Sequence, residues 1–308
     1  MNTSPKIFAI VVTFNRRLLL EKCINALLFQ TSALERIVIV NNASTDNTHE
    51  WIYSSSLAQH PHITYHLSKE NLGGAGGFAV GMQMAFAMGS DWVWMMDDDA
   101  EPQPDALEEL LKVATNTQNV YGSLAVNGPD TAWATTLLEK DLNRVINLAA
   151  EIPEQAKVEF LPFLGFMIHC SLAEHIGLPD AGYFIAGDDV EYCSRALQSG
   201  SQLIIAGRSQ ISHPKSESYQ VRVLVREFTC LKLPPWKRYY DTRNRILNAK
   251  KYYGLRLLTQ TFPGLLVRLL AALWQEPRRA AQFWAFSAGF IDGLLGRKGR
   301  RHSFWCIS

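Results

Sequence analysis

The sequence predicts an α/β protein that begins with a doubly wound sheet and continues into a helical, basic C-terminal region. Two observations support this. Over the first hundred residues, apolar runs rich in β-branched residues alternate with segments of helical periodicity, the pattern of strands covered by helices on both faces. Polar or glycine-rich residues follow these runs, as expected where loops gather at the carboxyl ends of strands.

The individual elements follow from these patterns. Four apolar runs are predicted as strands: Ile7–Thr13, Ile37–Val40, Ile63–Leu67 and Trp92–Met96. Three helices are predicted between them: Leu18–Phe29, one that opens after NNASTDNT, and one that opens with the glycine-rich NLGGAGGF. The stretch from about residue 121 to residue 187 has mixed patterns that predict no clear order of elements.

Composition narrows the class of protein. The chain has 308 residues with 47% hydrophobic and 19% charged residues, which is enough to build a sizeable core. Its net charge of +1 gives no global field for nucleic acid. Five scattered cysteines with no CxxC pair predict a reducing compartment, with neither a disulfide framework nor a zinc site. The first strand begins close to the N-terminus, so we expect no signal peptide and a cytoplasmic chain.

The stretch WVWMMDDDA places three carboxylates at the end of a predicted buried strand. Like charges so close together repel one another, and burial removes their hydration, so a positive partner is expected. If the extended backbone continues, Asp97 and Asp99 share one side and Asp98 faces the other. Two oxygen ligands with this spacing suit Mg²⁺ or Mn²⁺. The alternative is that the triplet caps the helix that starts near Pro104.

Five segments in order, VVTFNR, VIVNNASTD, NLGGAGGF, WMMDDDA and GDDVEYCSRA, together resemble family 2 of the inverting glycosyltransferases. The resemblance runs from about Ile7 to His213. It implies a GT-A fold, which is a Rossmann-like nucleotide-diphospho-sugar transferase domain, over residues 1–235. Residues 236–308 would then form a helical C-terminal region that packs or associates with a membrane. DDDA combined with NLGGAGGF is most similar to the galactofuranosyltransferases, whereas the related rhamnosyltransferases more often carry DQD.

The resemblance also implies a donor site. Thr13 and Arg16 would line the uridine and pyrophosphate pocket, and a guanidinium suits that role because it grips phosphate oxygens in bidentate fashion. Asn41 stands where the family usually has Asp, and its amide can still hydrogen-bond uracil or ribose. Asn71 would contact the donor ahead of the glycines. For Asn41 a plain turn or helix cap, and for Arg16 a solvated surface charge, remain alternatives.

A second group of residues is assigned to the reaction and the metal by the same resemblance. Asp188 and Asp189 begin a predicted helix that ends near Gly200, and Asp189 would be the base that deprotonates the acceptor hydroxyl. Capping of that helix is the alternative. Asp97 and Asp99 would hold Mn²⁺ or Mg²⁺ against the donor diphosphate, with His213 as a third ligand. We therefore expect Asp97, Asp99, Asp189 and His213 to meet in one cleft.

The C-terminal region predicts a membrane surface. PGLLVRLLAALW and AAQFWAFSAGFIDGLL are apolar, yet each is too short or too interrupted to span a bilayer, and arginines and lysines flank both. They are typical of helices that lie in the interface of an anionic membrane; packing against the catalytic domain or a second copy of the chain is the alternative. A peripheral enzyme on the cytoplasmic face of the inner membrane suits a polyprenyl-diphosphate-linked glycan acceptor, as in O-antigen, capsule or arabinogalactan assembly.

The resemblance therefore predicts a metal-dependent inverting galactofuranosyltransferase that uses UDP-galactofuranose. Two rivals stay open. A dTDP-rhamnose-dependent rhamnosyltransferase shares segments like YYDTRNRI, which begins at Tyr239. A catalytically silent nucleotide-sugar-binding scaffold is the other rival, although a scaffold has no use for a metal pair plus a base.

Overall fold

The computed structural model describes residues 5–139, 143–223 and 226–308, and these fall into two compact units. The first unit comprises residues 1–179 and 192–215, and the second comprises residues 180–191 and 216–308. The second unit thus contains the hairpin before Pro235 together with the C-terminal helices, whereas the resemblance implied a catalytic domain that extends to residue 235. Helix α6 (Asp188–Gln198) begins with residues of the second unit and continues from Tyr192 with residues of the first.

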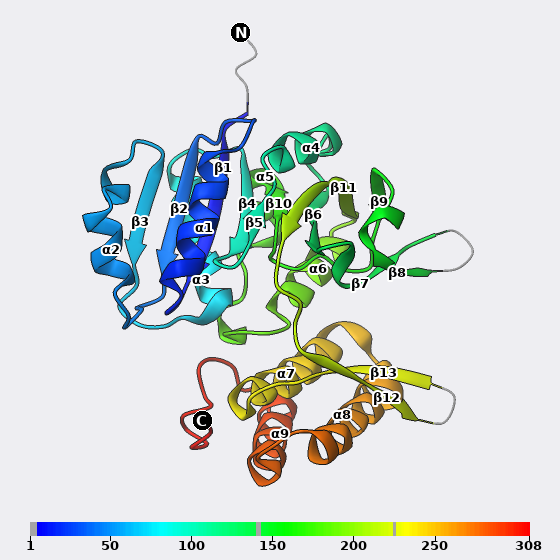
Figure 1. Cartoon of the computed structure of the whole chain (residues 1–308). Helices are drawn as coiled ribbons and strands as arrows, with labels where there is room; N and C mark the ends of the chain where they lie inside the picture. The colour runs from blue at the N-terminus through cyan, green and yellow to red at the C-terminus, as the bar shows by residue number, and fades with distance from the viewer. Residues whose placement is uncertain (1–4, 140–142, 224–225) are drawn as a thin grey trace. The chain divides into compact units, whose positions relative to one another are not determined.

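Eleven strands form one mixed sheet in the described part of the first unit, in the order β3-β2-β1-β4-β10-β6-β11-β5, with β7, β8 and β9 off this path (Figure 1). The strands are β1 Ile7–Thr13, β2 Arg36–Asn41, β3 Ile63–Leu67, β4 Trp92–Asp97, β5 Glu101–Pro102, β6 Val120–Asn127, β7 Asp130–Leu137, β8 Arg144–Leu148, β9 Gln155–Lys157, β10 Phe166–His169 and β11 Leu203–Ser212. The remaining α-helices of this unit are α1 Arg17–Leu28, α2 Thr48–Ser54, α3 Gly73–Ala87, α4 Ala106–Val113 and α5 Cys170–Ile176.

Strands β1 to β4 confirm the predicted doubly wound sheet. β1 pairs in parallel with both β2 and β4, and β2 pairs in parallel with β3. The carboxyl ends of these four strands therefore lie along one edge, where ligands bind in open α/β sheets. β10 was not predicted; it inserts antiparallel between β4 and β6, which makes the sheet mixed.

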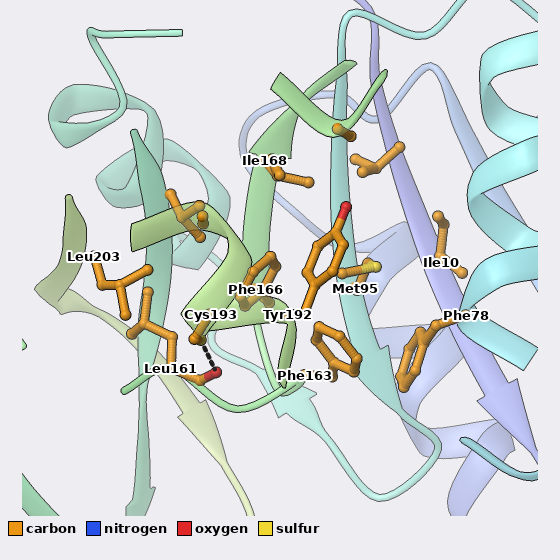
Figure 2. Close-up of a cluster of buried hydrophobic side chains, with 14 of the residues drawn as sticks. Ile10, Phe78, Met95, Leu161, Phe163, Phe166, Ile168, Tyr192, Cys193 and Leu203 are labelled. Atoms are coloured by element: carbon orange, nitrogen blue, oxygen red, sulfur yellow. Dashed lines mark hydrogen bonds between the residues drawn. The ribbon is translucent and has the colours of Figure 1, made fainter. Parts of the chain in front are cut away.

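Two apolar clusters cover the two faces of the sheet. Alternate residues of β1 divide between them, with Ile10 facing one cluster and Val11 the other, as the two-residue period of a strand requires. α3, α5 and α6 cover the first face, and α1, α2 and α4 cover the second. Figure 2 shows the first cluster, in which Tyr192 and Cys193 of α6 lie among sheet residues and the Cys193 thiol donates to the Leu161 carbonyl oxygen at 3.2 Å.

Glycine at position 77 sets how closely α3 approaches β1. A Cβ atom on Gly77 would lie 2.5 Å from Cγ1 of Val12 and 3.0 Å from Nδ2 of Asn42. No other residue fits without a shift of the sheet or the helix. The glycines of NLGGAGGF, which the resemblance linked to the donor, thus have at least one packing role.

The second unit contains β12 Ser218–Val223, β13 Arg226–Leu231, α7 Pro235–Asn248, α8 Phe262–Gln275 and α9 Arg279–Leu294, with π-helical turns at Ala249–Tyr253 and Leu257–Thr261. This confirms the predicted helical C-terminal region. Its apolar core is small, and a buried ion pair lies beside it: Arg238 donates to Glu276 at 2.6 Å, with both side chains almost fully buried. Gln282 also donates to Glu276, so the buried charge is well hydrogen-bonded.

One helical segment, Leu257–Gln275, is long and apolar enough to cross a membrane by length and composition alone. The prediction that PGLLVRLLAALW is too short to span a bilayer counted only part of this segment, because it left out the π-helical turn Leu257–Thr261 that precedes the apolar run. Only 28% of its most apolar window is buried within the structure. The segment therefore leaves much apolar surface without a partner among the residues described.

Candidate active site

The acidic triplet lies at the carboxyl end of β4, beside the end of β1. The Thr13 hydroxyl donates to Oδ2 of Asp98 at 2.7 Å. Nη1 of Arg16 donates to Oδ2 of Asp99 at 2.8 Å and to Oδ1 of Asp98 at 3.2 Å. The structure thus brings Thr13 and Arg16 to the triplet, and Arg16 is the positive partner that the crowded carboxylates require.

The alternation predicted for the triplet is wrong beyond its first member. β4 ends at Asp97, so Asp98 and Asp99 lie in a turn and both reach Arg16. Asp98 is the most buried of the three, and sequence reasoning gave it no role. The signal that could have revealed it is the neighbouring strand end, because parallel pairing of β1 with β4 puts Thr13 next to the triplet.

His213 joins this group from the end of β11. Its backbone N–H donates to the Val126 carbonyl oxygen at 3.0 Å, which fixes the chain just after the strand. Its Nε2 lies 3.4 Å from Oδ1 of Asp99, and the Trp133 ring packs edge-on at 6.0 Å between ring centroids. The predicted link between His213 and Asp99 is therefore present in the geometry, although the two residues are more than a hundred positions apart.

Burial raises the pKa values of Asp98 and Asp99, and neighbouring positive groups lower them. Burial raises the pKa of Asp98 to about 6, and its hydrogen bonds from Thr13 and Arg16 offset only part of this. Burial also raises the pKa of Asp99, but the interactions with His213 and Arg16 outweigh it, so that the pKa falls below its ordinary value. Asp99 is thus held ionised and available as a ligand.

The donor set at this edge fits a divalent cation. Oδ1 of Asp99 is buried without a hydrogen-bond partner among the described residues, and it lies 3.4 Å from Nε2 of His213, a separation that two ligands of one cation can have. Carboxylate oxygen and imidazole nitrogen are ligands that Mn²⁺ accepts. Within the described residues, however, no three His, Cys, Asp or Glu side chains are already arranged to hold a metal. Asp97 as a further ligand stays a prediction.

The two asparagines predicted to contact the donor are engaged within the protein. Asn41 is fully buried; its Nδ2 donates to the Tyr65 hydroxyl at 2.9 Å and its Oδ1 accepts from the Ser44 N–H at 2.8 Å. Oδ1 of Asn71 accepts from the Gly73 N–H at 2.8 Å and so shapes the start of α3. These bonds fit the turn-forming alternative, and contact of either side chain with a donor stays a prediction.

Asp188 and Asp189 are the first residues of α6 and belong to the second unit, whereas Asp99 belongs to the first. That Asp189 meets Asp97, Asp99 and His213 in one cleft therefore stays a prediction. The N–H of Val190 donates to Oδ1 of Asp189 at 2.8 Å. Burial raises the pKa of both carboxyls, and for Asp188 the charge of Asp189 adds to the effect. A carboxylate whose pKa lies above its ordinary value is better suited to accept a proton from a hydroxyl.

Comparison with known proteins agrees with this fold and identifies the family of the chain. Residues 8–177 match the family model described as glycosyl transferase family 2, and the chain belongs to that family. It is a glycosyltransferase that uses a nucleotide sugar.

Relatives are similar along nearly the whole chain. Galactofuranosyltransferase GlfT1 of Mycobacterium tuberculosis is 34% identical over 98% of this chain and 97% of its own length. Two solved structures share the fold at low identity. GalNAc-T7, solved with UDP, GalNAc and Mn²⁺, has a TM-score of 0.62 at 12% identity and covers 98% of this chain and 57% of its own. Mannosyltransferase PcManGT from Pyrobaculum calidifontis, in complex with GDP-Man and Mn²⁺, has a TM-score of 0.58 at 16% identity, over 96% of this chain and 88% of its own.

Proposed function

We propose that this protein transfers galactofuranose from UDP-galactofuranose to a lipid-linked glycan acceptor, with inversion at the anomeric carbon. The similarity to a galactofuranosyltransferase over nearly the whole chain carries the choice of sugar. The cluster of Thr13, Arg16, Asp98, Asp99 and His213 at the carboxyl edge of the sheet supports a site for a sugar diphosphate.

The donor diphosphate binds with a divalent cation, Mn²⁺ or Mg²⁺, held by Asp97, Asp99 and His213. When bound, this cation neutralises charge on the departing nucleotide. Arg16 contacts Asp98 and Asp99, so its guanidinium is placed to turn from them to a phosphate oxygen. Asp99, kept ionised by His213 and Arg16, holds its charge for the cation across the neutral pH range.

Asp189 takes the proton from the acceptor hydroxyl while that oxygen attacks the anomeric carbon. In this single displacement the acceptor C–O bond forms as the bond to the UDP oxygen breaks, and an α-linked donor gives a β-linked product. The N–H of Val190 donates to Oδ1 of Asp189 and so fixes that oxygen. Burial and the charge of Asp189 raise the pKa of the neighbouring Asp188.

A purified-protein assay tests the donor and the base together. UDP-galactofuranose and dTDP-rhamnose are each incubated with the protein, Mn²⁺ and a polyprenyl-diphosphate-linked glycan, and release of nucleotide diphosphate is followed with product analysis. We expect transfer from UDP-galactofuranose alone, lost in Asp189→Asn while that variant still binds UDP with Mn²⁺. Transfer only from dTDP-rhamnose refutes the sugar, and absence of transfer from either donor favours a silent scaffold.

The acceptor implies a membrane, and the second unit carries apolar surface suited to one. Large apolar side chains on and around α8 and α9 are exposed, with Leu255 and Trp274 each 81% exposed. We propose that this surface lies in the interface on the cytoplasmic face of the inner membrane, where nearby arginines contact anionic headgroups. Flotation with anionic vesicles should be strong and should fall in a Leu270→Ser, Trp274→Ser variant. Equal flotation of the variant and the unchanged protein contradicts this placement.

A further inference from the structure

The loop that leads into Asp188 and Asp189 has an unusual backbone. Phe184 has φ 66° and ψ −65°, and the N–H of Ile185 donates to the Tyr183 carbonyl oxygen at 2.8 Å, which closes a three-residue turn of a rare, strained type. Ala186 and Gly187 also have positive φ, at 65° and 78°. Two non-glycine residues with positive φ this close together, Phe184 and Ala186, do not persist unless the surroundings impose them.

The side chain of Asn244, in α7, hydrogen-bonds to three residues of this loop. It is fully buried, and its Nδ2 donates to the carbonyl oxygens of Tyr183, Ile185 and Ala186 at 3.0, 2.9 and 2.6 Å. The Tyr183 oxygen also accepts from the Ile185 N–H and from Arg243, so loss of the amide would affect chiefly the part-buried Ile185 and Ala186 oxygens. Nδ2 has two hydrogens, so one of them is shared between two of these oxygens, and the contacts together span the strained residue Phe184.

Arg243 and Asn248, which lie on the same helix as Asn244, also hydrogen-bond to the loop. Nη2 of Arg243 donates to the Tyr183 carbonyl oxygen at 2.7 Å, and its Nε donates to Oδ1 of Asn244 at 2.8 Å. That second bond fixes the amide, so its Nδ2 faces the loop. One turn further along α7, Nδ2 of Asn248 donates to the Gly187 carbonyl oxygen at 2.9 Å, directly before Asp188.

We propose that Asn244 is a positioning residue for the reaction: it holds residues 183–187 in the strained conformation that aims Asp189. This inference rests on the proposed role of Asp189 as the base. The side chain must be an amide, because a hydroxyl or an aliphatic group lacks two N–H donors and a carboxylate would repel the carbonyl oxygens. Loss of the amide lets the loop relax toward ordinary dihedral angles, which moves the first turn of α6.

The test compares Asn244→Ala with a control, Tyr219→Phe. The control removes another hydrogen bond of the second unit, the one that the Tyr219 hydroxyl donates to Glu276 at 2.7 Å, and it leaves the contacts of Arg243, Asn244 and Asn248 with the loop in place. Both variants should lower Tm. Only Asn244→Ala should lower kcat, by about tenfold to a hundredfold as expected for a misplaced catalytic group, with KM for the donor and the Kd of UDP with Mn²⁺ within about twofold of the unchanged protein.

A double-mutant cycle separates positioning from general destabilisation. In an Asp189→Glu background, Asn244→Ala should cost clearly less in kcat than it does alone, because both changes misplace the same group. If Asn244→Ala is not recovered folded, Asn248→Ala should show the same split between kcat and KM. An unchanged kcat in the variants, or full multiplication of the losses in the cycle, overturns the inference. Turnover retained by Asp189→Asn would instead refute the base itself.

Discussion

Replacing Arg16 by Met should tighten the binding of Mn²⁺ to the nucleotide-free protein. In the structure the Arg16 guanidinium contacts Asp98 and Asp99 at 3.2 and 2.8 Å, and because Asp99 is a proposed metal ligand, Arg16 competes with a cation for Asp99. Its side chain is 44% exposed, which means that each contact is worth only about 0.2–1 kcal/mol after solvent screening. The contact with Asp99 therefore amounts to about 0.2–1 kcal/mol, which corresponds to a Kd lower by about 1.4-fold to fivefold.

Isothermal titration of Mn²⁺ into the two proteins measures the effect. Arg17→Met is the matched control, because it removes the same charge one residue away, from a guanidinium that contacts Glu21 at 3.4 Å. The control should leave the Kd of Mn²⁺ nearly unchanged. With UDP present, Arg16→Met should bind Mn²⁺ more weakly than the unchanged protein, because the UDP phosphate has lost the guanidinium that binds it. Unchanged or weaker binding of Mn²⁺ alone by Arg16→Met would refute the view that the triplet is the metal site.

Three further predictions concern packing, charge and pH. Gly77→Ala forces a Cβ to 2.5 Å from Val12 and should lower the free energy of unfolding by about 1–3 kcal/mol in chemical denaturation; loss below this range contradicts a close α3–β1 contact. Arg238→Met leaves the buried Glu276 uncompensated and should cost about 3–5 kcal/mol, much of it recovered when Glu276→Leu is added. Because burial raises the pKa of Asp189 above 3.8 and the base must be ionised, kcat should rise with pH through that raised pKa, while the same ionisation costs stability; a flat kcat profile from pH 4 to 8 excludes this carboxyl as the base.

The sequence predicted the elements whose pattern is local. The apolar runs of β1 and β3 were predicted with their observed bounds, because β-branched residues buried on both faces leave a signal within a few positions. β10 left no such signal. Its four residues form a strand only because β4 and β6 pair with it from either side, and that pairing depends on contacts distant in sequence.

Some residues of the candidate site could be found from the sequence and others could not. His213 and Asp99 were matched by motif, and their 3.4 Å contact follows from strands that bring both to one edge. Asp98 was missed because β4 ends at Asp97, and the two-residue alternation of a strand no longer applies in the turn that follows. Asn244 could not be found from sequence at all, since the backbone carbonyls it serves are set by an irregular loop.

The loop contacts also change the meaning of the segment YYDTRNRI, which begins at Tyr239 and pointed equally to a rhamnosyltransferase. Within the second unit, Arg243 and Asn244 from this segment bind backbone carbonyl oxygens of the loop before Asp188. These side chains bind backbone atoms of the protein, so their contacts do not depend on which sugar the donor carries. With Asp189 as the proposed base, the contacts of this segment concern the position of the base, and the segment carries no weight in choosing between the two donors.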